Sequence, residues 1–116
     1  MVTVRDVAER LRARVLAGEC RLGREITGGY VGDLLSMAMS RATFGNIWVT
    51  VQGHPNVVAV AILVGISAVV VADGAKVEPA TLEKADQEGI PFLSSPASAF
   101  DIVAELAAMG LRGTAC

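Results

Sequence analysis

Residues 45–74 read GNIWVTVQGHPNVVAVAILVGISAVVVADG, and this stretch decides the fold class. Its first part alternates as a strand does, with Ile47, Val49 and Val51 on one side and Trp48 and Thr50 on the other. A helical segment follows, with Pro55 suited to its first turn. A continuous apolar run then ends at Asp73–Gly74, as expected for a buried strand. The stretch therefore predicts one strand–helix–strand unit.

The flanking segments extend the same alternation in both directions. We predict helices over residues 4–17, 33–42, 79–88 and 96–109, and strands over residues 20–27 and 90–95. Alternating strands and helices with short connections indicate a three-layer α/β/α fold around a mainly parallel sheet of about four to five strands. We expect a single domain over residues 1–116, with residues 111–116 as a frayed tail.

Composition and charge exclude several classes of protein. The first 41 residues carry seven Arg against five acidic residues, a mild imbalance without a basic stripe, so no nucleic-acid partner is expected. The longest uncharged apolar run, residues 57–72, is too short for a membrane span. Cys20 and Cys116 suggest neither a disulfide framework nor a metal cluster, which favours the cytoplasm. The apolar share of 53% is high and indicates extra buried interface, as in a homodimer.

Small and polar residues stand where the predicted strands end. In an open α/β sheet, ligands bind beyond the carboxyl ends of the strands, and helix N-termini there favour anions. The candidate ligand-binding residues are Thr27, Gly28, Gly29, Gln52, His54, Asn56, Asp73, Ser94 and Ser95. The sequence therefore predicts a polar rim that could hold a small phosphate-bearing ligand.

The glycine pair at this rim matches neither of the common phosphate motifs. No Gly-Lys-Ser/Thr follows for a P-loop, and the G-x-G-x-x-G spacing of dinucleotide-binding folds is absent. Gly28 and Gly29 could equally serve only to form a tight turn between a strand and a helix. A small enzyme using His54 and Asp73 is a third reading, but neither residue has a visible partner. We therefore expect no catalytic residues, no metal and no cofactor.

Three segments resemble the DRTGG domain family: REITGGYVGDLLS (residues 24–36), residues 45–74, and ADQEGIPFLSSPASAFDIV (residues 85–103). Thr27-Gly28-Gly29 keeps the end of the family's naming pentapeptide, whereas the preceding acid–Arg pair is changed. The resemblance implies a fold similar to the N-terminal domain of HPr kinase. It also implies an accessory module of the kind found with paired CBS modules in some inorganic pyrophosphatases and beside catalytic domains in some phosphotransacetylases.

Free-standing members of this family are often encoded near iron-only hydrogenase subunits. Some carry names that suggest an iron–sulfur protein, but two distant cysteines cannot supply a four-cysteine cluster. The first hypothesis is thus a non-catalytic regulatory module, a homodimer sensing an adenine nucleotide or another phosphate-bearing metabolite. The alternative is a structural or partner-binding accessory protein of a hydrogenase or other redox complex.

Overall fold

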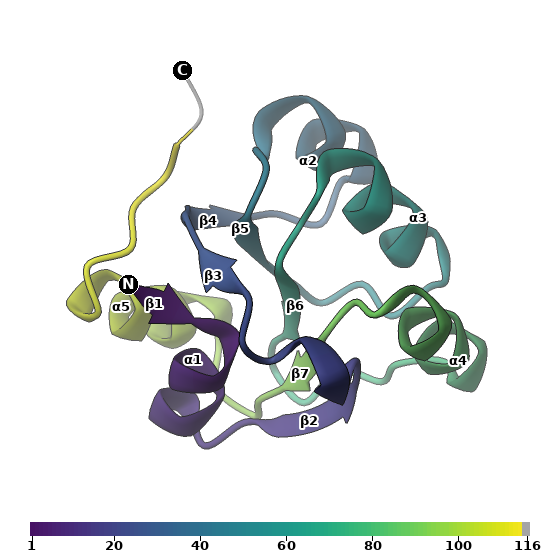
Figure 1. Ribbon diagram of the computed structural model, residues 1–116, viewed down its shortest axis with the longest axis horizontal. Coiled ribbons are helices and arrows are strands. Elements are labelled where there is room, and N and C mark those ends of the chain that lie inside the picture. Colours follow the sequence, from purple (N-terminus) through teal and green to yellow (C-terminus); the bar gives the residue numbers. More distant parts are fainter. Residues whose placement is uncertain (115–116) are drawn as a thin grey trace.

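A five-stranded sheet forms the centre of the molecule in the computed structural model, which describes residues 1–114 (Figure 1). The spatial order of the strands is β2-β7-β6-β5-β4, and β4 to β7 run parallel while β2 is antiparallel to β7. The strands are β2 (Arg14–Ala17), β4 (Gly28–Val31), β5 (Asn46–Thr50), β6 (Ala68–Val71) and β7 (Phe92–Ser94). The predicted three-layer fold with a mainly parallel sheet is confirmed.

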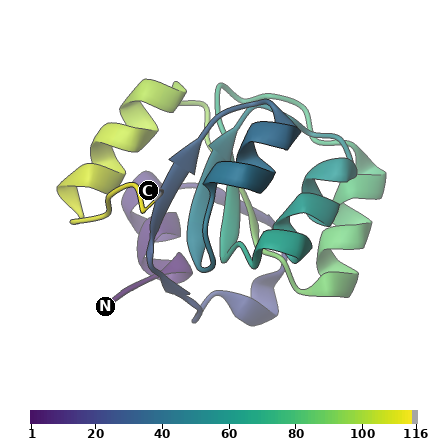
Figure 2. The same cartoon turned by 90° about the horizontal axis from the view of Figure 1, so that it is seen from above.

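Two layers of helices cover the sheet (Figure 2). One layer holds α2 (Leu35–Arg41), α3 (Asn56–Val64) and α4 (Pro79–Glu88), and the other holds α1 (Val4–Leu11) and α5 (Ala99–Ala108). Since β4, β5, β6 and β7 lie side by side in chain order, right-handed crossovers place α2, α3 and α4 on the same face. The chain changes face only after β7, when it enters α5.

The sheet supplies an apolar core to each helix layer. Trp48 and Phe92 are fully buried on the side of α2, α3 and α4, and Ile47 and Leu93 are fully buried on the side of α1 and α5. This division follows from the period of two along a strand, which turns successive side chains to opposite faces. The stretch over residues 45–74 thus serves both cores, as its near-continuous apolar pattern predicts.

The first helix is shorter than the sequence predicts. It ends at Leu11, because Arg12 takes a left-handed conformation with φ 51° that stops the helical hydrogen bonding. The prediction of a helix to residue 17 is therefore wrong: β2 follows instead and pairs with β7 through Val15 and Leu93. Tertiary pairing overrides the helical spacing of the local sequence.

Other segments also differ in detail from the predictions. The segment over residues 20–27 holds a short 3-10 turn η1 (Glu19–Arg21) and the two-residue strand β3 (Glu25–Ile26), which pairs with β1 (Val2–Thr3) in a separate small sheet. The N-cap of α5 is Ser98, whose hydroxyl accepts from the Asp101 N–H at 3.2 Å, and not Ser95.

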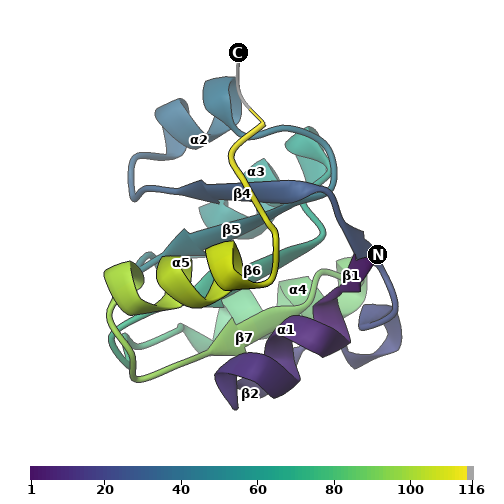
Figure 3. The same ribbon diagram turned by 90° about the vertical axis from the view of Figure 1, so that its left-hand side faces the viewer.

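The segment after α5 returns to the sheet. Leu111 is buried, and the carbonyl of Arg112 accepts a hydrogen bond of 2.9 Å from the N–H of Gly29 at the edge strand β4. Figure 3 shows this segment crossing β4. Residues 111–114, which the sequence predicts to fray, therefore run packed beside β4, and residues 115 and 116 lie outside the described residues.

Candidate functional site

The carboxyl ends of the parallel strands collect six of the nine predicted site residues. They are Gln52, His54, Asn56, Asp73, Ser94 and Ser95. The chain after β6 goes to the α4 face and the chain after β7 goes to the α5 face, so the switch point of the sheet lies between these two strands. This is the place in an open α/β sheet where a ligand crevice is expected.

Backbone hydrogen bonds close the switch point. Asp73 donates its N–H to the carbonyl of Ala97 at 2.8 Å, and Gly74 donates to the carbonyl of Ser95 at 2.9 Å. The Ser95 hydroxyl accepts from the Ala97 N–H at 3.1 Å. The loops after β6 and β7 are thus bonded directly to each other where a crevice would open.

The side chains of Gln52 and His54 also make hydrogen bonds within the protein. The imidazole Nδ1 of His54 accepts the N–H of Asn56 at 3.0 Å, and the Gln52 side-chain amide donates to the carbonyl of Asp33 at 3.1 Å. Within residues 1–114, every buried side-chain nitrogen or oxygen has a hydrogen-bond partner. Among these described residues the rim therefore holds no buried side-chain polar atom without a partner.

The other three predicted residues, Thr27, Gly28 and Gly29, lie at the amino ends of the parallel strands, at the opposite end of the sheet from the rim. Gly28 and Gly29 are the first residues of β4, so the prediction that a strand ends at Thr27 and turns at the glycine pair is wrong. The hydroxyl of Thr27 donates to the carbonyl of Phe44 at 2.8 Å, and its N–H donates to Gly45 at 3.0 Å. Residues 32–34 make the actual turn into α2, because β4 must first pair with β5 along its length.

Gly28 allows the C-terminal segment to approach β4. A Cβ atom at Gly28 would collide with the carbonyl oxygen of Arg112 and with the side chain of Thr114. Thr114 is held in turn by Asn46, whose amide donates to its hydroxyl at 3.0 Å, and by a hydroxyl contact with Thr43. The Thr-Gly-Gly stretch is therefore the place where the C-terminal segment docks on the sheet.

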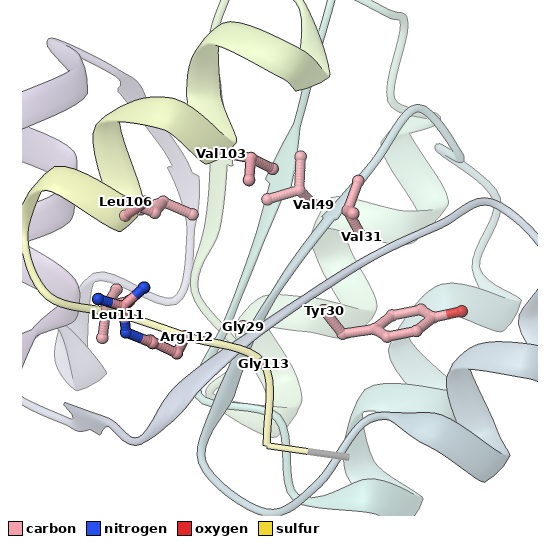
Figure 4. Close-up of a pocket in the computed structure, with 10 residues that line it drawn as sticks. Gly29, Tyr30, Val31, Val49, Val103, Leu106, Leu111, Arg112 and Gly113 are labelled. Atoms are coloured by element: carbon pink, nitrogen blue, oxygen red, sulfur yellow. The ribbon is translucent and has the colours of Figure 1, made fainter. Parts of the chain in front are cut away.

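An apolar groove of about 330 Å³ lies between α5, β4 and the C-terminal segment (Figure 4). Its lining residues are Gly29, Tyr30, Val31, Val49, Val103, Leu106, Ala107, Leu111, Arg112 and Gly113. The aromatic ring of Tyr30 points away from Val49 and Val103, so aliphatic side chains dominate the hollow (Figure 4). Because Gly29 lacks a side chain, β4 leaves this part of the groove open.

Arg112 is the one charged residue that lines the groove. Within residues 1–114 an ion pair joins Arg10 to Glu105, with 2.6 Å between Nε and Oε2, and no ion pair involves Arg112. An exposed guanidinium beside an aliphatic hollow suits a ligand with a flat, weakly polar body and an anionic group. Sequence reasoning missed this groove, because its walls come from distant segments.

A second, more polar hollow of about 500 Å³ lies beyond the end of β7. Arg10, Arg12 and Ser95 line it together with Asp101 and Glu105. Arg12 reaches this edge because α1 ends there and β2 starts antiparallel to β7. The mixed charges make this hollow less selective for an anion than the groove beside Arg112.

Groups with displaced pKa values lie outside both hollows. A hydrogen bond from the Thr3 backbone N–H holds the pKa of Asp6 below its usual value, and burial lowers the pKa of Arg24. Within residues 1–114, no three His, Cys, Asp or Glu side chains gather closely enough to hold a metal ion. No helix in that range is both long and apolar enough to cross a membrane.

Comparisons with known proteins agree with the fold. The sequence profile of the DRTGG domain matches residues 6–109. A solved structure described as the CBS and DRTGG domains of the regulatory region of Clostridium perfringens pyrophosphatase, complexed with the activator diadenosine tetraphosphate, is similar to this chain. The TM-score is 0.68 at 16% sequence identity, over 86% of this chain and 44% of that chain. This chain therefore spans less than half of that structure's length. Curated protein sequences gave no match.

Proposed function

Because the chain belongs to the DRTGG domain family, we propose that it is a non-catalytic regulatory module of the cytoplasm that binds an adenine nucleotide or a related phosphate-bearing metabolite as a homodimer. The similar structure supports this reading, since it is part of a regulatory region and was solved with a dinucleotide activator. Diadenosine tetraphosphate is the activator of that pyrophosphatase. That this chain binds a ligand of the same chemical class is part of the proposal.

The groove beside Gly29 is the proposed ligand site. The observation that carries the proposal is that Gly29, from the stretch shared with the family, lines an apolar hollow next to the unpaired Arg112. Val49, Val103 and Leu106 would contact the adenine ring, and the Arg112 guanidinium would bind phosphate oxygens. The hollow is at the lower end of the size range of small-molecule sites, which spans roughly 300–1,000 Å³.

Such a ligand would touch three separate parts of the fold at once: α5, β4 and the C-terminal segment. It would therefore favour the arrangement in which the segment is docked on β4. A ligand that binds one arrangement better than another shifts their populations, which is the physical basis of regulation.

The rim at the carboxyl edge is the other position for the same ligand class. It stays a candidate through Gln52, His54, Asn56, Asp73, Ser94 and Ser95, of which Gln52, His54 and Ser95 already make side-chain hydrogen bonds within the protein. A ligand that engaged these three side chains would compete with those bonds, whereas the groove requires no such exchange.

Isothermal titration with AMP, ATP and diadenosine tetraphosphate tests the proposal. We expect binding that weakens by about 10- to 100-fold in Arg112→Ala, since a charge-assisted hydrogen bond is lost, and that disappears in Val103→Trp, which fills the groove. The rim variant His54→Ala should bind like the native protein. Absence of heat with all three nucleotides would overturn the nucleotide proposal, and loss of binding only in His54→Ala would move the site to the rim.

A partner-binding role in a hydrogenase or other redox complex is the second candidate function. The observation favouring it is the number of large apolar side chains left on the surface, including Phe44, Leu63 and Phe100. Affinity capture from the native host followed by mass spectrometry tests this role, and recovery of the chain with only copies of itself would count against it.

A further inference from the structure

Helix α3 is uncharged around its whole circumference, yet it is not fully covered. Residues Asn56–Val64 include no Asp, Glu, Lys or Arg. Val57, Val58 and Ala61 are buried against the sheet, while Ile62 and Leu63 are 44% and 69% exposed. A helix that is apolar on all sides is normally buried on all sides, so the outward side of α3 requires a cover that residues 1–114 do not supply.

Phe44 extends this apolar surface at the end of α3. Its side chain is 73% exposed, and its ring lies against Gly65, where a Cβ atom would be 3.0 Å from ring atom Cε2. We define the α3 strip as Phe44, Ala59, Ile62 and Leu63. The large members leave on the order of 300 Å² of apolar surface exposed, comparable with the largest patch on a typical monomer.

The helices on either side of the strip carry opposite charges. Helix α2 ends with Arg41 and contains no acidic residue, whereas α4 carries the exposed Glu83 and Glu88 against Lys84, and its Asp86 accepts the Gly18 N–H at 2.8 Å. Both helices contact α3, one on each side. All three run from the carboxyl edge of the sheet to the amino edge, so Arg41 and Glu88 lie at the same end of the layer.

We propose that a second copy of this chain packs on the α3 strip, with the two-fold axis parallel to α3. This axis places α2 of each copy against α4 of the other, so that Arg41 faces the acidic end of α4 twice in one interface. An axis perpendicular to α3 would instead oppose the acidic α4 to itself. Since the strip carries no charge, the two copies meet at their centre without repulsion.

The anatomy of this surface suits a homodimer. An apolar centre with charged flanks is the usual arrangement of protein interfaces. Three helices about 10 Å apart, in a molecule measuring 33 × 30 × 24 Å, form this side of the protein. This inference rests on the homodimer in the proposed function and assigns the surface that forms it, away from the groove.

Sedimentation velocity over a concentration series tests the interface without any ligand. We expect the native protein to sediment as a dimer and Leu63→Glu to weaken association at least 100-fold, as for a central interface residue. Phe100→Glu is the matched control, because Phe100 is 84% exposed on α5, in the opposite helix layer, and should leave the dimer intact. Circular dichroism of both variants checks that the fold persists.

Three outcomes would overturn the proposal: a native protein that is monomeric at high micromolar concentration, a dimer that survives Leu63→Glu, or a dimer lost in Phe100→Glu and not in Leu63→Glu. Should Leu63→Glu prove unfolded, Ile62→Ser replaces it with the same expectation. Nucleotide titration of the monomeric variant separates this result from the proposed function, because the groove lies in the other layer and should still bind.

A charge exchange tests the direction of the axis. Arg41→Glu should weaken the dimer by about 2- to 30-fold, as expected for the loss of two exposed ion pairs worth roughly 0.2–1 kcal/mol each, and adding Glu88→Arg should restore it. Failure of the second change to restore association would contradict an axis parallel to α3.

Discussion

The adjacent glycines Gly28 and Gly29 should respond very differently to the same substitution, with a large loss of stability at Gly28 and almost none at Gly29. In Gly28→Ala the new methyl group collides with the backbone oxygen of Arg112, which cannot move without displacing the C-terminal segment. In Gly29→Ala the nearest atom is the methyl group Cγ2 of Ile47 at 3.5 Å, an ordinary contact. The two variants have the same chemistry and differ by one position, so each is the control for the other.

The magnitude follows from what the displaced segment loses. The bond from Gly29 to the Arg112 carbonyl and the bond from Asn46 to Thr114 are each worth about 1 kcal/mol, and withdrawing Leu111 from the core loses up to about 2 kcal/mol. Two effects offset roughly half of this total loss of stability: the released segment regains conformational entropy, and Ala lowers the conformational entropy of the unfolded chain. We therefore expect Gly28→Ala to lower the free energy of unfolding by about 2 kcal/mol, and Gly29→Ala to change it by less than about 0.5 kcal/mol.

Scanning calorimetry and urea unfolding measure this difference. A loss of about 2 kcal/mol corresponds to a Tm lower by roughly 8 °C for a domain of this size. Equal Tm values for the two variants would refute the reasoning, because they would mean that the segment does not pass close to Gly28.

Two further predictions concern the hydrogen bonds made by the carboxylates of Asp33 and Asp6. Asp33→Ala should destabilise the fold by about 1–3 kcal/mol, measured by urea unfolding, because its carboxylate accepts from the Thr50 hydroxyl at 2.8 Å and the Val51 N–H at 2.9 Å. Unchanged stability would contradict this role. Asp6→Asn should lower Tm at neutral pH, because the Thr3 N–H lowers the pKa of Asp6 below 3.8. That contribution is complete above pH 3.8 and is lost as the pH falls through the lower folded pKa, so the Tm difference should narrow in acid.

The sequence predicts those parts of the fold whose pattern is local. The alternation and apolar runs of residues 45–74 place β5, α3 and β6 correctly, and Thr3 with Asp6 forms the predicted capping box. The apolar spacing of residues 14–17 predicts a helix, and only the pairing with β7 makes them a strand. Such pairing depends on contacts between distant segments and leaves no periodic signal.

The glycine pair lies in a strand and not in the predicted turn for a related reason. Two glycines before a helix resemble a turn, whereas Gly28 is needed for the close approach of a segment more than eighty residues later in the chain. Arg112, at the predicted frayed end, lines the groove for the same reason. The rim residues Gln52, His54 and Asp73 do lie at one end of the sheet, as predicted, because parallel strands all have their carboxyl ends there.

Amide chemical-shift mapping during nucleotide titration tests the central claim most directly. The claim is that the groove formed by Gly29, Val103 and Arg112 binds an adenine nucleotide. We predict that AMP, ATP or diadenosine tetraphosphate shifts the resonances of these residues and leaves those of His54 and Ser95 unchanged. Shifts confined to His54, Ser95 and their neighbours, or no shifts with any of the three nucleotides, would contradict it.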